Sequence, residues 1–147
     1  MTDERPDLVV ISCGVKKRPH RAPAANLYTG SYFLQMKAAA QSLRATHGYR
    51  ILSALHGLVE PATKLDPYNK RMGQPGSVTG DVVRAQAEAT SLLGLAKVVI
   101  LAGRDYMTVA RAAWPDACTP LAEAPGMGYQ KRLLFQIQMR GRVECTQ

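Results

Sequence analysis

A cluster of hydrogen-bond donors follows the first apolar run of the sequence. Residues 11–17 read Ile-Ser-Cys-Gly-Val-Lys-Lys, which brings a hydroxyl, a thiol, backbone N–H groups and two ammonium groups close together. Such donors suit a phosphate oxygen, so Ser12, Lys16 and Lys17 are candidate phosphate ligands. The segment matches neither GxxxxGK[ST] nor GxGxxG, and an ordinary turn with surface lysines is the alternative. Cys13 is either a core residue or a candidate nucleophile.

A second candidate is the sequence Tyr28-Thr29-Gly30, which comes directly before a predicted helix. The exposed N–H groups and positive dipole end at the start of a helix attract an anion. Thr29, Gly30 and Ser31 are therefore candidate phosphate contacts, and the ring of Tyr28 can stack on a base. A capped helix with a packed tyrosine is the alternative interpretation.

A third group of polar residues follows the second predicted strand. Ser53 and His56 stand at the end of that strand, and residues 65–72 then read Leu-Asp-Pro-Tyr-Asn-Lys-Arg-Met. Tyr68 and Arg71 offer an aromatic face and a cation. The pattern favours base contacts by Ser53, His56 and Tyr68, whereas a lone histidine is more often structural or simply exposed.

Two further segments carry weaker signals. Residues 102–106 read Ala-Gly-Arg-Asp-Tyr and can simply cap the next helix. Residues 126–132 form a glycine turn that opens a basic helix. Lys131 and Arg132 there either contact phosphate or lie on a solvated helix face.

Alternating strands and helices must position these segments. Strands are predicted over residues 8–13, 49–54 and 97–102, with residues 117–121 as a candidate fourth strand. Helices are predicted over residues 31–47, 81–93, 105–113 and about 128–140, with long loops over 14–28 and 55–80. The first helix is expected to end before Gly48, and Thr79 or Asp81 is expected to cap the second.

The order of these elements predicts a single α/β domain over residues 1–147, with a small, mostly parallel sheet and helices on both faces. A chain of this length suits one domain with its own core. Ligands of such sheets bind outside the carboxyl ends of the strands. The segments 12–17, 53–57 and 102–106 are therefore expected to meet at one edge.

The charge balance favours a polyanionic partner. The chain carries a net charge of +8, and no acidic residue occurs between Leu8 and Val59, where many of the cations lie. A second acid-free stretch runs from Ala124 to Val143. Clustered positive charge is typical of nucleic-acid binding, and a basic surface that only keeps the protein soluble is the alternative.

Composition excludes several other classes. No apolar run approaches the ~20 residues that span a bilayer, and the acidic N-terminus does not resemble a signal peptide, so a cytoplasmic location without a membrane partner is expected. The three cysteines stand at positions 13, 118 and 145 without a CxxC pair, which supports neither a zinc site nor a disulfide framework and fits a reducing compartment. We therefore expect no metal and no cofactor.

Taken in order, these segments resemble the YaaA-type family. The resemblance rests on Ser12-Cys13-Gly14 with the two following lysines, on Tyr28-Thr29-Gly30, on the segment from Leu52 to Pro61, and on Pro67-Tyr68 with Arg71-Met72. The resemblance covers roughly residues 8–110, and a weaker similarity is found at residues 128–132. It implies a compact α/β core that presents the YTG helix to DNA, and a reader of modified bases such as 5-methylcytosine.

The leading hypothesis is therefore a protein that binds double-stranded DNA without catalysis. The candidate phosphate contacts are Ser12, Lys16, Lys17, Arg18, Arg21, Thr29, Gly30, Ser31, Lys37, Arg71, Lys131 and Arg132. The candidate base contacts are Cys13, Tyr28, Thr29, Tyr32, Ser53, His56 and Tyr68.

Two alternatives remain open. The first is an enzyme that acts on a nucleobase or nucleotide, such as a glycosylase-like hydrolase, with Asp66, Cys13 and His56 as its catalytic candidates. The second is a small-molecule nucleotide binder that uses the same edge of the sheet. The sequence leaves the oligomeric state open.

Overall fold

Four strands form the central sheet of the computed structural model, in the order β4-β3-β1-β6. The structure describes residues 5–145. The strands of the chain are β1 (Leu8–Ser12), β2 (Ala22–Pro23), β3 (Tyr49–Ser53), β4 (Gly57–Val59), β5 (Lys64–Leu65) and β6 (Val98–Leu101). The helices are α1 (Ala24–Leu27), α2 (Ser31–Leu43), α3 (Gly80–Ala89), α4 (Arg104–Ala110) and α5 (Met127–Arg140).

The centre of the sheet is parallel and buried on both faces. Strand β1 pairs in parallel with β3 on one side and with β6 on the other. All residues of β1 and β6 are buried, as their continuous apolar runs predict for strands covered on both faces. The predicted single α/β domain with a mostly parallel sheet is confirmed.

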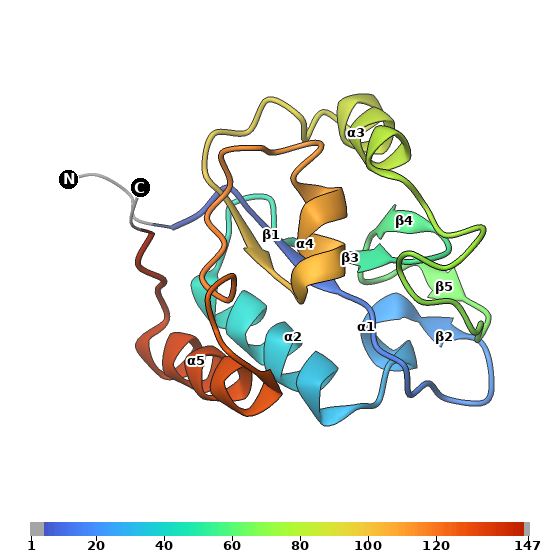
Figure 1. Ribbon diagram of the computed structural model, residues 1–147, viewed down its shortest axis with the longest axis horizontal. Coiled ribbons are helices and arrows are strands. Elements are labelled where there is room, and N and C mark those ends of the chain that lie inside the picture. The colour runs from blue at the N-terminus through green and yellow to red at the C-terminus, as the bar shows by residue number, and fades with distance from the viewer. Residues whose placement is uncertain (1–4, 146–147) are drawn as a thin grey trace.

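Helices flank the sheet in two pairs (Figure 1). Helix α2 packs against β1 and α5, whereas α3 packs against β4 and α4. The chain moves from β1 to β3 in one direction and from β4 back to β6 in the other. Because crossovers between parallel strands are right-handed, such a reversal places their helices on opposite faces. The direction in which successive strands are added therefore reverses between β1 and β6, and a ligand crevice is expected at the carboxyl ends of these two neighbouring strands.

The first long helix ends earlier than its apolar spacing predicts. Helix α2 stops at Leu43, and Arg44 adopts the left-handed conformation with φ 53°. The N–H groups of Thr46 and His47 then donate to the carbonyls of Pro6 and Asp7, which draws the chain out of the helical path. The prediction that the helix runs to residue 47 is wrong because these distant partners compete with the next helical turn. The next two helices, α3 and α4, also end a few residues before their predicted limits.

The predicted loop over residues 55–80 contains a strand that pairs with the sheet. Strand β4 folds back on β3 in antiparallel register, with Ser53 opposite Gly57. Gly57 has φ 79°, a conformation open to glycine, and the amide of Gln86 occupies the space where a Cβ would lie. Strand β5 pairs with β2, so both predicted long loops carry short paired segments.

The prediction that the cysteines form no disulfide is wrong. Cys118 and Cys145 form a disulfide, with Cα atoms 5.5 Å apart, although 27 residues separate them. Cys13 is free and buried. The candidate fourth strand at 117–121 is reduced to one bridge between Cys118 and Val99, because Pro120 has no N–H to continue the ladder.

The last helix agrees with its predicted position. Helix α5 buries Leu134 and Ile137, and Leu133 packs beside them half-buried. Thr79 caps α3, its hydroxyl accepting a hydrogen bond from the Val82 N–H. Within residues 5–145, no helix has the length and apolar character needed to span a bilayer.

Candidate functional site

Three hydroxyl groups form a chain at the carboxyl end of β3. The Tyr68 Oη lies 2.7 Å from the Ser53 Oγ and 2.6 Å from the Tyr28 Oη. The Ser53 oxygen already accepts hydrogen bonds from the N–H groups of Leu55 and His56, which use both of its lone pairs. Ser53 therefore donates to Tyr68, and Tyr68 in turn donates to Tyr28.

A thiol and a fourth hydroxyl lie at the neighbouring strand ends. The Cys13 Sγ directly after β1 is 3.4 Å from the Oη of Tyr106, which belongs to the helix after β6. These are the two strands at which the chain diverges, where α/β sheets open a crevice for ligands. The Met72 backbone also lies near the Tyr106 hydroxyl, where it lowers the pKa of that group against the larger effect of burial, so the loop after Tyr68 reaches this position.

Lys17 connects the basic loop to this cluster. Its Nζ lies 4.5 Å from the centre of the Tyr68 ring and 5.6 Å from that of Tyr28, both distances within the range of cation–π attraction. A β-bridge between Lys17 and Tyr28 holds the two segments together. Burial lowers the pKa of Lys17 below its ordinary value, and the electrostatic interaction with Cys13 acts in the opposite direction.

Tyr68 forms one wall of a shallow pocket on the outer side of the cluster. The pocket has a volume of about 450 Å³ and is lined by Val15, Lys17, Arg18, Pro19, Pro67, Tyr68 and Asn69. His56 meets the Tyr68 ring edge-on, with the ring centres 5.4 Å apart. A half-buried aromatic wall, an amide and two cations can hold a flat, polar ligand that carries negative charge nearby.

The tyrosines of the cluster stay protonated. Burial raises the pKa values of Tyr28, Tyr68 and Tyr106 well above the ordinary 10, and the electrostatic interaction with Cys13 adds to the shift. They therefore act as neutral hydrogen-bonding groups at physiological pH.

The structure brings together several of the predicted base contacts. Cys13, Tyr28, Ser53, His56 and Tyr68 all belong to this cluster or touch it. The ring of Tyr28, however, is 1% exposed and packs against Phe33. Its face is therefore unavailable for stacking on a base at the surface, and its contribution to the site comes from the hydroxyl.

Several predicted phosphate contacts are engaged within the protein. Ser12 is buried, and its hydroxyl donates to the Met36 sulfur, so the prediction of a phosphate contact there is wrong. The Lys37 ammonium donates to the Ala25 carbonyl and the Arg18 Nε donates to the Asn26 carbonyl. These bonds connect the basic loop and the middle of α2 to the short helix α1.

The predicted catalytic carboxylate faces outward. Asp66 forms an exposed ion pair with Arg21, with 3.1 Å between Oδ2 and Nη1. Exposed pairs of this kind contribute little to stability. Among residues 5–145, no group of three or more His, Cys, Asp or Glu is placed to hold a metal ion.

Two side chains of α5 reach the start of the YTG helix. The Lys131 Nζ donates to the Ser31 Oγ at 3.0 Å, and the Tyr32 hydroxyl donates to the Gln130 side chain at 2.6 Å. Arg132 is exposed on the same helix. Thr29 and Gly30 lie beside Lys16, whose carbonyl accepts from the Thr29 N–H. The second basic stretch therefore adjoins the first in space.

The sequence assigns no role to Tyr106, which the structure adds to this site. Its place shortly after a strand is the signal that marks it in the sequence. Asn69 is one of several polar residues in the segment 65–72, and its place in the pocket distinguishes it from the others.

The fold and this cluster define a small, doubly wound α/β domain with a polar and aromatic site at the carboxyl edge of its sheet. Residues 8–136 match a family of unknown function (DUF6884), and the chain belongs to that family. The match covers the four-stranded sheet and every residue of the hydroxyl cluster. No curated protein matches the sequence. The resemblance to the YaaA-type family is not tested by this match and stays a prediction.

Proposed function

We propose that this protein binds double-stranded DNA along a cationic rim formed by residues 14–21 and 66–71, and that one base enters the pocket beside Tyr68. The observation that carries the proposal is the position of Lys17 over the rings of Tyr28 and Tyr68 at the wall of that pocket. An aromatic wall beside cations is the arrangement that proteins use to hold an unstacked base next to its phosphates.

Exposed positive charge at the rim supports the proposal. Lys16 and Arg71 are exposed, and within residues 5–145 no hydrogen bond or ion pair engages either side-chain cation. The net charge of +8 favours a polyanion as the partner. Lys131 and Arg132 extend the positive surface toward the start of α2.

The identity of the base is the finer part of the proposal. Val15, Pro19 and Pro67 give the pocket an apolar rim, which suits a methyl group on a pyrimidine ring. A 5-methylcytosine turned out of the stack would place its ring against Tyr68. The specific activity that we propose is therefore the recognition of modified cytosine in cytoplasmic DNA, as the resemblance to the YaaA-type family implies.

A nucleobase-processing enzyme is the second candidate. The contact between Cys13 and Tyr106 favours it, because a thiol beside a hydroxyl at a ligand crevice can take part in nucleophilic chemistry. The ion pair of Asp66 with Arg21 weighs against the glycosylase-like form of this hypothesis. Release of a free base from modified DNA on incubation with the protein would establish the enzyme instead.

The test is a fluorescence anisotropy titration with duplexes that differ only in cytosine methylation, at two salt concentrations. We expect the Lys16→Ala/Arg71→Ala double variant to bind at least tenfold more weakly than the wild type. Arg84→Ala removes one exposed cation from α3, outside the rim, and should change affinity less than twofold. Absence of binding, or binding equally affected by both variants, would overturn the DNA-binding proposal. Equal affinity for the two duplexes would overturn only the methylcytosine part.

A further inference from the structure

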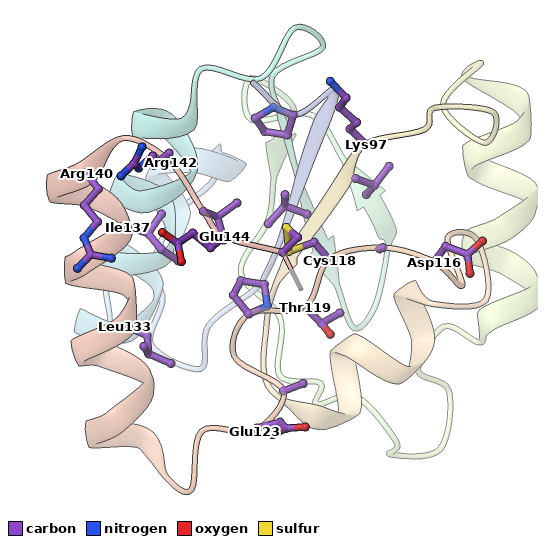
Figure 2. Close-up of a pocket in the computed structure, with 18 of the residues that line it drawn as sticks. Lys97, Asp116, Cys118, Thr119, Glu123, Leu133, Ile137, Arg140, Arg142 and Glu144 are labelled. Atoms are coloured by element: carbon purple, nitrogen blue, oxygen red, sulfur yellow. A yellow bond between two sulfur atoms is a disulfide. The ribbon is translucent and has the colours of Figure 1, made fainter. Parts of the chain in front are cut away.

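A groove outside the candidate site separates α5 from the edge of the sheet. It has a volume of about 1080 Å³, and its lining includes Val98 and Val99 of β6, Leu133 and Ile137 of α5, and the loop around Thr119. Figure 2 shows the Cys118–Cys145 disulfide in the middle of this groove, between α5 and the sheet edge. The disulfide thus holds the C-terminal segment in the groove.

The two halves of the disulfide are anchored very differently. The Cys118 N–H donates to the Val98 carbonyl at 2.9 Å, and the Cys118 carbonyl accepts from the Ile100 N–H at 2.8 Å. This half belongs to the edge of the sheet. Cys145 lies at the end of an extended segment that leaves α5 at Gly141, where the left-handed conformation ends the helix.

The segment of residues 142–145, which we call the arm, has few attachments. In the described part of the chain, no hydrogen bond or ion pair is formed by Arg142, Val143, Glu144 or Cys145. Val143 alone packs against the core, and the other three residues are exposed. The covalent S–S bond is therefore the main restraint that keeps the arm in the groove.

We propose that the Cys118–Cys145 disulfide is a redox site, opened by a dithiol reductant, that latches the arm into the groove. A thiolate of the reductant attacks one protein sulfur, and the S–S bond breaks with its electron pair on the other sulfur, which takes up a proton. The second thiol of the reductant then displaces the first protein sulfur. The reductant leaves as a disulfide, and the protein gains two thiols.

Cations outnumber carboxylates among the residues that line the groove. Lys97, Arg111, Arg140 and Arg142 line the groove, against the carboxylates of Asp116, Glu123 and Glu144. Nearby cations stabilise a departing thiolate. The Arg111 Nη2 donates to the hydroxyl of Thr119 at 2.7 Å, so one of these cations contacts the residue that follows Cys118 in the sequence. In a cytoplasmic protein, a disulfide is typically transient or redox-sensing rather than structural.

The inference does not rest on DNA binding, because the groove and the hydroxyl cluster share no residue. Opening the latch removes one wall of the groove and frees the Cys118 thiol, while the backbone bonds of Cys118 to β6 remain. Cys13 is 7% exposed and lies outside the exchange. It therefore serves as an internal reporter of whether the domain stays folded.

The test combines thiol alkylation, limited trypsin digestion and hydrogen exchange on the full chain, before and after treatment with dithiothreitol. We expect no alkylation of Cys118 or Cys145 before treatment, and rapid alkylation of both afterwards while Cys13 reacts at least tenfold more slowly. Trypsin should cleave after Arg142 several times faster once the disulfide is open, because a freed arm can enter the protease, while amide exchange over β6 should stay unchanged. Alkylation of both cysteines without reductant, a disulfide that resists reduction in the folded protein, or equal reactivity of Cys13 would overturn the proposal.

Two variants separate the latch from general destabilisation. Cys145→Ser should reproduce the fast tryptic cleavage after Arg142 without any reductant, and dithiothreitol should then have no further effect. Cys13→Ser leaves the disulfide intact and should respond to dithiothreitol as the wild type does. Cleavage after Arg142 in Cys145→Ser that is as slow as in the oxidised wild type would show that other contacts hold the arm.

Discussion

The hydroxyl oxygens of Tyr28 and Tyr68 lie 2.6 Å apart, although 40 residues separate them in the sequence. This contact joins the turn before α2 to the long loop after β4, and the same Tyr68 oxygen is bonded to Ser53 at the end of β3. Hydrogen bonds thus join three segments of the chain that belong to two separate sequence motifs.

The first prediction concerns the bond between Tyr28 and Tyr68. Tyr68→Phe keeps the ring but leaves the buried Tyr28 and Ser53 hydroxyls without their partner, so the free energy of unfolding should fall by about 1–3 kcal/mol. Urea denaturation measures the change. Tyr49→Phe is the control, because Tyr49 is half-buried and its hydroxyl has no hydrogen bond within residues 5–145. It should cost less than about 0.5 kcal/mol. Equal losses in the two variants would contradict the role given to the cluster.

The second prediction concerns the turn between β3 and β4. A Cβ at position 57 would meet the Gln86 amide, which donates to the His56 carbonyl and accepts from the Leu58 N–H. Gly57→Ala should therefore lower the free energy of unfolding by about 2 kcal/mol through the positive φ and the displaced amide. Gly94→Ala is the matched control, because nothing lies within 4 Å of its Cβ position. Thermal and urea denaturation of both variants should separate them clearly. A Gly57→Ala variant as stable as the wild type would contradict the close packing of Gln86 against Gly57.

The third prediction concerns stability at high pH. Burial raises the pKa of Tyr32 from 10.0 to about 12, so the folded state holds the phenolic proton more tightly than the unfolded state. The stabilisation from this difference is complete below pH 10 and is lost as pH rises from 10 to about 12. Lys17 acts in the opposite sense, because its pKa is lowered in the folded state.

Tyr32→Phe isolates this effect. Urea denaturation at pH 9, 10.5 and 11.5 should show a shallower loss of stability in the variant than in the wild type. The variant also loses the hydrogen bond to Gln130, so its stability at pH 9 is expected to be lower. Parallel pH profiles for the two proteins would show that Tyr32 does not titrate as expected.

The fourth prediction concerns the salt dependence of DNA binding and rests on the proposed function. About five phosphate contacts correspond to a slope of about −4 to −5 in a plot of log affinity against log salt concentration. Lys16→Ala/Arg71→Ala should reduce the magnitude of that slope by about 2, since each lost phosphate contact removes roughly 0.9. Arg84→Ala should leave the slope unchanged. A slope near zero for the wild type would exclude phosphate contacts as the source of affinity.

The sequence by itself determined the central sheet and its flanking helices. The apolar runs of residues 8–11 and 98–101 are typical of strands buried on both faces, and the periodic helices between the strands favour parallel pairing. The same pattern sufficed to place the ends of β1, β3 and β6 at one edge. The clustering of Cys13, Ser53 and Tyr106 follows from that topology.

Only the tertiary structure decided which polar groups face the ligand crevice and which face the core. Ser12 and Lys17 belong to the same motif, yet one donates to a buried sulfur and the other lies over two aromatic rings. The pairing of Cys118 with Cys145 and the early end of α2 likewise depend on segments far away in the chain. The physical reason is that periodicity fixes the faces of regular elements, whereas the direction of a side chain at a strand end or in a loop is set by whichever distant group completes its contacts.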